Sequence, residues 1–491
     1  MKKVVIIGGG LGGLAAAIPL AHAGFDVTLF EQNDHFGGKL MPVKLGDHHF
    51  DFGPNTITMP QVFKGVFEGV GERAEDYIRL IKLDTHTRNH FPDGTAIDFL
   101  SDPEAMRKQL QTHAPADAER YDAFIKEITR LYGLSETYFF PTVFQSWRDY
   151  VSPSLGRAML QVRPLQTMHS FFGKYFRDPH MRQALDRYAT YVGSSPYKAP
   201  ATFAMIAYLE LVQGVYYAEK GNITIAEGFA AVARKKGAVL RHSTAVKRIT
   251  VNEGKTEGVE LADGTTVEAD IVILNGDLLS TFPALVDARH RPSFTDAKAS
   301  SYEPSISAFV VTAGLNTRLD ALRHHNVFFS GDYAQEFEDL FQHRRYSEEP
   351  TIYISNSSYT DPNVSPTGDN LFILANAPAL TPEGKLQLEP EAYKERLYDL
   401  LETYGIDIRS HLVEEAIFTP AFIKDHFHAY RGALYGPSSH RKKDAFLRPG
   451  NAAKDIRDLY FTGGSTHPGG GSPMVVMSGQ NLARRIIAET K

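Results

Sequence analysis

The sequence predicts an α/β fold built on a parallel sheet, and three observations predict it. The apolar run at residues 4–7 is typical of a buried parallel strand, and a glycine-rich turn and an apolar helical segment follow it at once. Residues 26–30 predict the next strand, which completes a Rossmann-type βαβ unit. Residues 458–474 repeat the order of strand, glycine-rich loop and helix start near the other end of the chain.

The first turn carries the pattern Gly8-x-Gly10-x-x-Gly13. In such a unit the first glycine makes the tight turn, the second lets the backbone approach a pyrophosphate, and the third lets the helix pack closely on the strand. The phosphates then lie at the helix N-terminus, where free N–H groups and the helix dipole favour negative charge. The turn therefore predicts a dinucleotide site; a glycine-rich turn without a ligand is the alternative.

The residues after the second strand extend this prediction. Glu31 closes that strand, at the position where a ribose hydroxyl needs a carboxylate acceptor. The glycines of Gly37-Gly38-Lys39 permit close backbone approach, and Lys39 can neutralise a phosphate. With the segment Phe50-Asp51-Phe52-Gly53-Pro54-Asn55, they suggest a longer cofactor than the opening unit alone would grip.

The C-terminal segment indicates which cofactor this is. After the strand at 458–462 comes a loop rich in glycine, in which Ser472 is a good N-cap and Pro473 suits the first helical position. We expect a helix from Met474 to about residue 488. A nicotinamide enzyme rarely needs such a closing piece, whereas FAD, held extended through a domain, does. Only one dinucleotide fingerprint is present, so we expect no NAD(P)H site.

Composition excludes several classes of function. The 491 residues predict two or three structural units, and the near-balanced net charge of −6, without a basic stripe, argues against a nucleic-acid partner. The chain has no cysteine, which excludes disulfides, thiolate chemistry and Cys-ligated metal sites. We find no signal peptide and no apolar run long enough to span a membrane, so we expect a cytoplasmic protein that can still attach to a membrane surface.

A helical, aromatic region occupies the middle of the chain. The pattern is helical from about residue 103 to 187, and arginines and lysines alternate there with aromatic residues, among them Phe144, Trp147, Tyr150, Phe171, Phe172 and Phe176. Such a mixture suits a face that lies on a membrane, and equally a helical core rich in aromatics. Residues 202–217 predict a second apolar helix, which either lines a site for a long apolar ligand or packs in a core.

The remaining segments predict a discontinuous domain organisation. Strand patterns at 307–312 and 351–355, with helical ones at 332–342 and 391–404, indicate a mixed sheet in a second, α+β domain. We therefore expect three units: an FAD-binding domain (1–80, 221–282 and 450–491), a substrate domain (81–130 and 283–449), and a helical membrane-associated or lid region (131–220).

These motifs together resemble a known family. The glycine motif with Glu31, the Gly37-Gly38-Lys39 and Phe50-Asp51-Phe52-Gly53-Pro54 segments, and residues 459–471 look like a bacterial carotenoid desaturase of the phytoene desaturase group, essentially end to end. The resemblance implies the FAD-binding fold shared with amine oxidases, a peripheral membrane habit and a long polyene substrate. No metal is implied, and no catalytic side chain is assigned, because the isoalloxazine carries the chemistry.

By this resemblance a set of residues would bind the cofactor. Gly8, Gly10, Gly13, Glu31 and Lys39 would hold the ADP half of FAD, and Gly464 with Met474 would lie near the ribityl chain and the flavin ring. The full expected set is Gly8, Gly10, Leu11, Gly12, Gly13, Glu31, Gly38, Lys39, Gly53, Pro54, Asn55, Val246, Gly464 and Met474.

Two chemistries occur within this group, desaturation of the chain and oxidation of a terminal methyl group. Ser465-Thr466-His467-Pro468-Gly469 looks more like the desaturases. Residues 191–200, 215–221 and 430–436 are more similar to the staphylococcal-type C30 carotenoid oxygenases, and the oxygenase, acting on a chain such as 4,4'-diaponeurosporene, is favoured. The alternative is a 4,4'-diapophytoene or phytoene desaturase. In either case electrons would pass to oxygen or a membrane quinone.

Two further functions stay open from the sequence. A flavin amine oxidase shares the expected fold but acts on a small cation, and it would need an aromatic cage or an acidic lining near the flavin. A prenyl-binding protein of the GDP-dissociation-inhibitor type keeps the architecture without redox work. Intact Glu31 and both glycine loops argue against the second possibility.

The histidines do not predict a metal site. His48-His49 and His324-His325 are adjacent pairs, which we expect at the surface, and no spacing of the His-Glu-x-x-His type occurs. His467 lies in the loop expected on the flavin side, where it either contacts the flavin site or stabilises the loop through a hydrogen bond.

Overall fold

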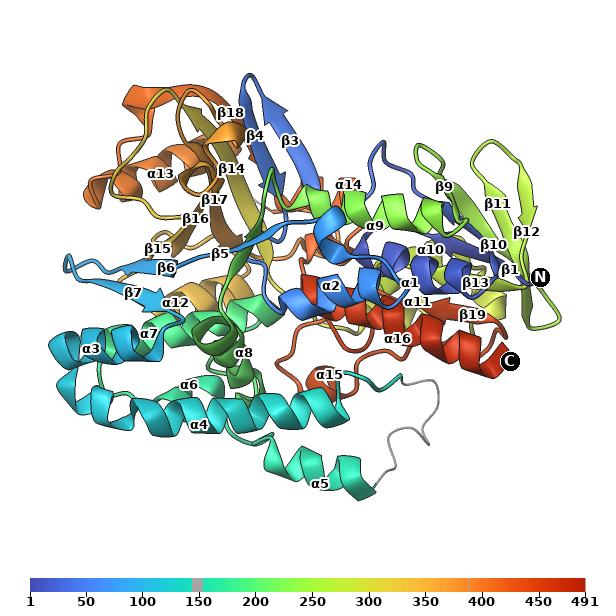
Figure 1. The fold of residues 1–491 in the computed structure, drawn as a ribbon, viewed down its shortest axis with the longest axis horizontal. Coiled ribbons are helices and arrows are strands. Elements are labelled where there is room, and N and C mark those ends of the chain that lie inside the picture. Colours follow the sequence, from blue (N-terminus) through green and yellow to red (C-terminus); the bar gives the residue numbers. More distant parts are fainter. Residues whose placement is uncertain (144–152, 387, 491) are drawn as a thin grey trace.

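The computed structural model describes residues 1–491 except 144–152, 387 and 491, and it confirms the α/β fold. A parallel sheet with the strand order β19-β13-β1-β2-β9 lies close to both chain termini (Figure 1). Its strands come from three distant parts of the sequence: β1 (Lys3–Ile7), β2 (Asp26–Phe30), β9 (Val239–Arg241), β13 (Ile271–Leu274) and β19 (Leu459–Phe461).

Alternation along β1 explains how both faces of this sheet are covered. Val4 and Ile6 point to one face, where they pack with α1 (Leu11–His22), α2 (Pro60–Glu68), α9 (Ile223–Lys235) and α16 (Ser472–Thr490). Val5 and Ile7 point to the other, where they pack with α10 (Leu278–Leu285) and a three-stranded antiparallel sheet. That small sheet comprises β10 (Val246–Asn252), β11 (Lys255–Leu261) and β12 (Thr266–Glu268), and Asp263-Gly264 lies in the turn between the last two.

The second large sheet is mixed and has the order β18-β14-β17-β16-β15-β6-β7. On β14, Phe309 and Val311 pack against α13 (Pro390–Thr403), whereas Ala308 and Val310 point to the opposite face, toward β4 (His48–Phe52) and α14 (Pro420–Phe427). Its strands are β6 (Thr85–His90), β7 (Ala96–Leu100), β14 (Ser307–Leu315), β15 (His325–Phe328), β16 (Ile352–Asn356), β17 (Asn370–Ala377) and β18 (Leu412–Phe418).

The helical region packs beside β6 and β7, in the lower part of Figure 1. Asp102 caps its first helix by accepting hydrogen bonds from the N–H groups of Glu104 and Ala105. The helices are α3 (Pro103–His113), α4 (Pro115–Tyr138), α5 (Pro153–Gln161), α6 (Met168–Phe172) and α7 (Pro179–Asp186). Phe171, Phe172 and Phe176 are fully buried in this core, whereas Phe144, Trp147 and Tyr150 lie outside the described residues. None of the helices described combines the length and apolar composition that a membrane crossing requires.

The predicted helix at 202–217 is wrong as a continuous element. A 3-10 helix (Ala201–Met205), one turn of α8 (Ile206–Tyr208) and a π-helix (Leu209–Gln213) follow one another, and β8 (Tyr216–Ala218) then pairs with β5 (Leu80–Lys82). Gly214 has a φ of 95°, which ends the helical stretch before the strand begins. The apolar pattern alone could not reveal this strand pairing.

Short elements complete the structure. A β3–β4 hairpin (Met41–Leu45 and His48–Phe52) places Phe52 against the mixed sheet. The remaining α-helices of the described residues are α11 (Asp296–Ser300), α12 (Tyr333–Glu338) and α15 (Lys442–Phe446).

Candidate cofactor and active site

A cavity of about 910 Å³ lies between the carboxyl ends of the parallel strands and the mixed sheet. Its polar part is lined by the loop after β1, the residues after β2, the loop after β13 and the glycine-rich loop before α16. Its apolar part is lined by alternate residues of β14 and β17, namely Ala308, Val310, Phe372 and Leu374. Crevices at the carboxyl ends of parallel strands are the usual ligand sites of such sheets.

The glycine turn after β1 forms the floor of the polar part. Gly8 has a φ of 99°, and a Cβ atom there would overlap the carbonyl oxygen of Asn275. A Cβ on Gly13 would overlap the carbonyl oxygen of Gly8, so Gly13 serves close packing of the helix on the strand and does not line the cavity. Gly10 and Leu11 do line it, and Gly10 at the N-cap of α1 offers no side-chain oxygen. The first N–H groups of α1 are therefore available to an anion.

Gly12 packs between helices, and its contact with a cofactor stays a prediction. It lies outside the cavity lining, and a Cβ atom on it would come within 2.7 Å of Asn275 Oδ1 and 3.0 Å of Val475. Gly479 of α16 lies against the backbone of Gly12, and a Cβ atom on Gly479 would overlap the carbonyl oxygen of Gly12. Gly12 therefore lets α1 and α16 pack backbone to backbone.

Glu31 lies in the cavity wall at the end of β2 and is 6% exposed. Its Oε2 accepts a hydrogen bond of 2.7 Å from the N–H of Gly9, and its Oε1 accepts one of 2.9 Å from the N–H of Asn33. These bonds orient the carboxylate beside the glycine turn. A carboxylate accepts about four hydrogen bonds, so it retains capacity for hydroxyl groups of a ribose.

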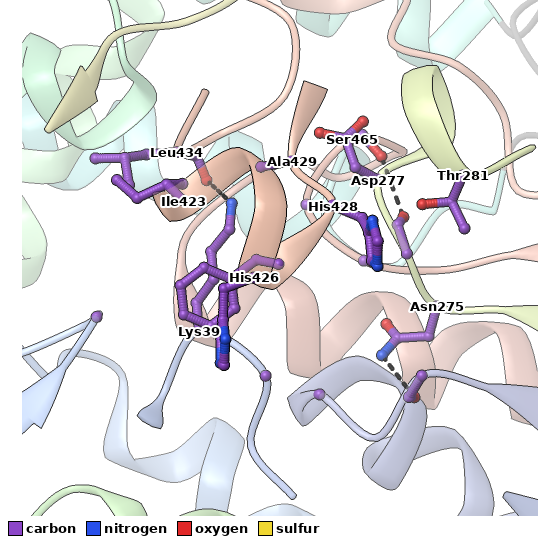
Figure 2. A pocket seen from close by; sticks show the side chains of 18 of the residues that line it. Lys39, Asn275, Asp277, Thr281, Ile423, His426, His428, Ala429, Leu434 and Ser465 are labelled. Atoms are coloured by element: carbon purple, nitrogen blue, oxygen red, sulfur yellow. Dashed lines mark hydrogen bonds between the residues drawn. The ribbon is translucent and has the colours of Figure 1, made fainter. Parts of the chain in front are cut away.

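Lys39 also lines the cavity, with Gly38, but its amino group is directed to backbone carbonyls. It donates hydrogen bonds of 2.6 Å to Leu434 and 3.3 Å to Ala433, and Figure 2 shows the side chain reaching Leu434. Burial lowers the pKa of Lys39, and the charge of Asp277 opposes this shift. Lys39 thus holds the loop at 433–434 against the cavity; its contact with a phosphate stays a prediction.

The other expected residues divide into two groups. Gly53, Pro54, Val246 and Gly464 line the cavity together with the residues named above. Asn55 and Met474 do not: the Asn55 carbonyl accepts a hydrogen bond of 3.1 Å from Asn222, and Met474 packs in a cluster around Tyr132 and Leu209.

Several lining residues were not predicted. Asn275 and Asp277 follow β13, and the Asn275 side chain donates a 3.0 Å hydrogen bond to the Gly8 carbonyl. Asp277 caps α10 and accepts a 2.9 Å bond from the N–H of Tyr430; burial raises its pKa. The order Asn275-Gly276-Asp277 after a buried strand is a signal that could have indicated them, because such positions face the ligand crevice. His426 and His428 also line the cavity, but no sequence pattern around them indicates this position.

The surface position expected for the two histidine pairs is wrong for three of the four residues. His48 is 2% exposed, His324 1% and His325 none. His325 lies in β15, an inner strand of the mixed sheet, and burial lowers the pKa of His324 to about 3. The fact that two histidines are adjacent in the sequence does not indicate whether their strand lies inside a sheet or at its edge.

His467 is buried and does not line the cavity. Its Nε2 is 2.8 Å from the carbonyl oxygen of Phe139, and burial lowers its pKa to about 4. A neutral imidazole that donates to this carbonyl ties the glycine-rich loop to the end of α4. Of the two roles expected for His467, this geometry favours loop stabilisation.

A parallel sheet with a glycine turn, a carboxylate at the end of the second strand and a closing loop from the chain end defines a dinucleotide-dependent enzyme. The model of one family, described as "Flavin containing amine oxidoreductase", matches residues 11–487. The chain belongs to this family. This membership confirms FAD as the cofactor and oxidoreductase as the enzyme class. It excludes the alternative of a prenyl-binding protein without redox activity.

The chain is also similar to two named enzymes over nearly its whole length. It is 34% identical to "4,4'-diapolycopene oxygenase" of Methylomonas sp over 494 residues, which cover 99% of this chain and 98% of that protein. It is 31% identical to "4,4'-diaponeurosporene oxygenase" of Staphylococcus aureus (strain MRSA252) over 490 residues, with coverage of 99% and 98%. The carotenoid oxygenase resemblance found in the sequence is thereby confirmed.

Solved structures agree on the fold. An oxidoreductase from Methanosarcina mazei superposes with a TM-score of 0.64 at 16% identity, covering 98% of this chain and 100% of that one. Wild-type putrescine oxidase bound to putrescine superposes with a TM-score of 0.63 at 14% identity, with 99% of each chain covered. At such identities the likeness concerns the fold alone.

Proposed function

We propose that this protein is an FAD-dependent carotenoid oxygenase that oxidises the terminal methyl group of a C30 apocarotenoid such as 4,4'-diaponeurosporene. The observation that carries the proposal is the likeness to two carotenoid oxygenases at 34% and 31% identity, which extends over 99% of the chain. The expected cofactor residues that line the cavity would hold the dinucleotide. Bound FAD would supply the two-electron oxidation.

The chain's own residues would bind and shield the reacting groups. Ala308, Val310, Phe372 and Leu374 form an apolar wall of the cavity, which suits a hydrocarbon and excludes water. Lys39 and Asp277 would keep the loop at 430–434 closed over the site, because each bonds a backbone group of that loop. The electron acceptor would be oxygen or a membrane quinone.

The direct test is expression in bacteria that already make a C30 carotene, followed by mass analysis of the pigments. We expect products that have gained oxygen at a chain end. Loss of hydrogen without gain of oxygen would instead support the desaturase, which the segment 465–469 resembles. Unchanged pigments, with peroxide released by the purified protein when amines are added, would support an amine oxidase.

We also propose that the helical region attaches to a membrane surface. Leu160 and Leu165 are 81% and 80% exposed, more than any other large apolar residue described except Met1. The exposed Arg157 and Lys174 lie near them in sequence, where cations can meet lipid headgroups. Attachment there would let a water-insoluble polyene enter from the bilayer.

The domain organisation follows as a proposal. The cofactor domain would comprise residues 1–80, 221–282 and 450–491, and all five strands of the parallel sheet lie within these segments. The substrate domain would comprise 81–130 and 283–449, and the helical region 131–220. The helix α4 crosses the boundary at 130, so the last two units would move as one.

A further inference from the structure

A cluster of buried polar side chains lies apart from the residues expected to hold FAD. His86 comes from β6, Arg187 and Tyr191 from a 3-10 helix (Arg187–Val192), and Glu210 from the π-helix (Leu209–Gln213). Three separate segments of the chain therefore converge on one point. Neither His86 nor Glu210 has any exposed surface, and Arg187 is 7% exposed.

The cluster is organised around the carboxylate of Glu210. Its Oε2 lies 3.6 Å from Nδ1 of His86 and 3.6 Å from Nη2 of Arg187, and its Oε1 accepts a hydrogen bond from the Tyr191 hydroxyl. The Arg187 guanidinium lies 5.5 Å from the ring centres of Tyr188 and Tyr191. This arrangement holds a positive and a negative charge in the interior with few direct hydrogen bonds between them.

Several atoms of the cluster have no hydrogen-bond partner among the described residues. They are both ring nitrogens of His86, Nε and Nη2 of Arg187, Oε2 of Glu210, and the hydroxyl of the neighbouring Tyr188. Buried polar atoms are nearly always paired, so an unpaired set that converges on one point is suited to receive a ligand atom. Glu336 is equally buried but, unlike Glu210, has hydrogen bonds to both carboxylate oxygens. It accepts bonds of 3.2 Å from Ser330, 3.0 Å from the N–H of Thr351 and 3.3 Å from Asn376.

The unpaired atoms are mostly donors. Burial lowers the pKa of His86 to about 3, so the ring is neutral and carries one N–H. Burial disfavours the charged form of Arg187, but Tyr191 and Glu210 outweigh this effect and raise its pKa, so its N–H groups persist. The cluster therefore suits an oxygen that accepts hydrogen bonds, and the Arg187 charge opposes binding of an amine cation.

Neighbouring residues connect the cluster to the apolar end of the cavity, which His86, Arg187 and Glu210 do not themselves line. Tyr353, whose hydroxyl lies 2.8 Å from Nδ1 of His325, is paired across the sheet with Leu374, which lines the cavity. Tyr435 also lines the cavity, and a Cβ atom on Gly193, directly after the 3-10 helix, would lie 2.8 Å from its ring. Strand β6, which carries His86, is the hydrogen-bonded neighbour of β15, which carries His325.

We propose that Arg187, Glu210 and His86 form a hydrogen-bonding subsite for the carbonyl oxygen at the oxidised end of a long polyene. This inference rests on the proposed function and refines its substrate class: the protein binds chains that already carry oxygen at one end, as well as the hydrocarbon. A pure hydrocarbon would leave these donors unpaired, so the subsite discriminates in favour of the oxygenated chain. Such discrimination is large where a site is built to hydrogen-bond its ligand.

The test compares a C30 polyene with a terminal aldehyde and the corresponding C30 hydrocarbon, each added in detergent micelles to FAD-loaded protein while flavin fluorescence is followed. The main variant is R187M/E210Q, which removes both charges together and leaves no lone buried charge. The second variant, H86L, removes one neutral ring only. E336Q is the matched control, because Glu336 is equally buried but fully paired.

We expect the unmodified protein and E336Q to bind the aldehyde at least about tenfold more tightly than the hydrocarbon, and both cluster variants to lose most of this preference. Equal affinity for the two polyenes in the unmodified protein, or an undiminished preference in H86L, would overturn the subsite while leaving the proposed function in place. If neither polyene alters the flavin signal of the unmodified protein, the proposed function fails and the subsite fails with it.

Discussion

Gly12 and Gly479 face each other where the two ends of the chain meet. A Cβ atom on Gly479 would overlap the carbonyl oxygen of Gly12, so α1 and α16 approach through bare backbone. Figure 1 shows the resulting pair of helices beside the parallel sheet. Because the glycine turn and the closing loop lie at the starts of these helices, their packing sets the shape of the polar part of the cavity.

Replacement of Gly479 by alanine should therefore destabilise the protein. The added methyl group has to displace the backbone of α1, which costs about 1–3 kcal/mol as overpacking in a tight core does. Thermal unfolding measures the loss. Gly65→Ala is the control, since nothing lies within 4 Å of the Cβ position at Gly65 in α2, and it should leave stability unchanged or raise it by about 0.5–1 kcal/mol. Equal melting temperatures for the two variants would refute the close-packing role.

Glu31→Gln should weaken FAD binding. The amide keeps one acceptor oxygen, but its NH₂ group cannot accept the bond that Gly9 or Asn33 donates to the carboxylate. We expect the dissociation constant for FAD to rise by roughly tenfold, the effect of losing one hydrogen bond to a charged group. Fluorescence titration of the apoprotein measures it, with the exposed Glu268→Gln as the control. An unchanged constant would show that Glu31 serves the protein fold alone.

Leu160→Asp with Leu165→Asp should reduce attachment to membranes. The two changes place charges where we propose that apolar side chains enter the lipid, whereas Val413→Asp, at a site 54% exposed on β18, adds one charge elsewhere. Sedimentation with anionic vesicles should carry down the unmodified protein and the Val413 variant but much less of the double variant. If all three sediment alike, the membrane face lies elsewhere.

The pH dependence of stability should reveal Glu336. Burial raises its pKa from an ordinary 4.5 to about 7, so the unfolded chain releases this proton at a lower pH than the folded protein does. The contribution of Glu336 to stability is therefore full below about pH 4.5 and is lost as the pH rises through 7, by roughly 3 kcal/mol in all. The glutamine of Glu336→Gln does not titrate. As the pH rises over that range, the free energy of unfolding of the variant should therefore increase relative to that of the unmodified protein. Denaturant unfolding at several pH values tests this; a constant difference would contradict it.

Local patterns in the sequence predicted the cofactor end well. Gly8, Glu31 and the closing loop line the cavity, at positions that follow from a strand, a turn and a helix start, which are short-range features. The sequence could not indicate that Lys39 bonds a loop nearly 400 residues away. Nor could it indicate that His325 lies in an inner strand, or that His86, Arg187 and Glu210 converge from three segments. These features depend on tertiary packing, which the local pattern of residues does not encode.

The central claim is that the two chain ends close over one FAD molecule, and the absorbance spectrum of the purified protein tests it most directly. We predict a flavin band at about 450 nm that corresponds to one flavin per chain, with FAD released intact on denaturation. We also predict that Gly8→Val, whose side chain would overlap Asn275, purifies without this band. A folded, unmodified protein that stays colourless after incubation with FAD would contradict the account.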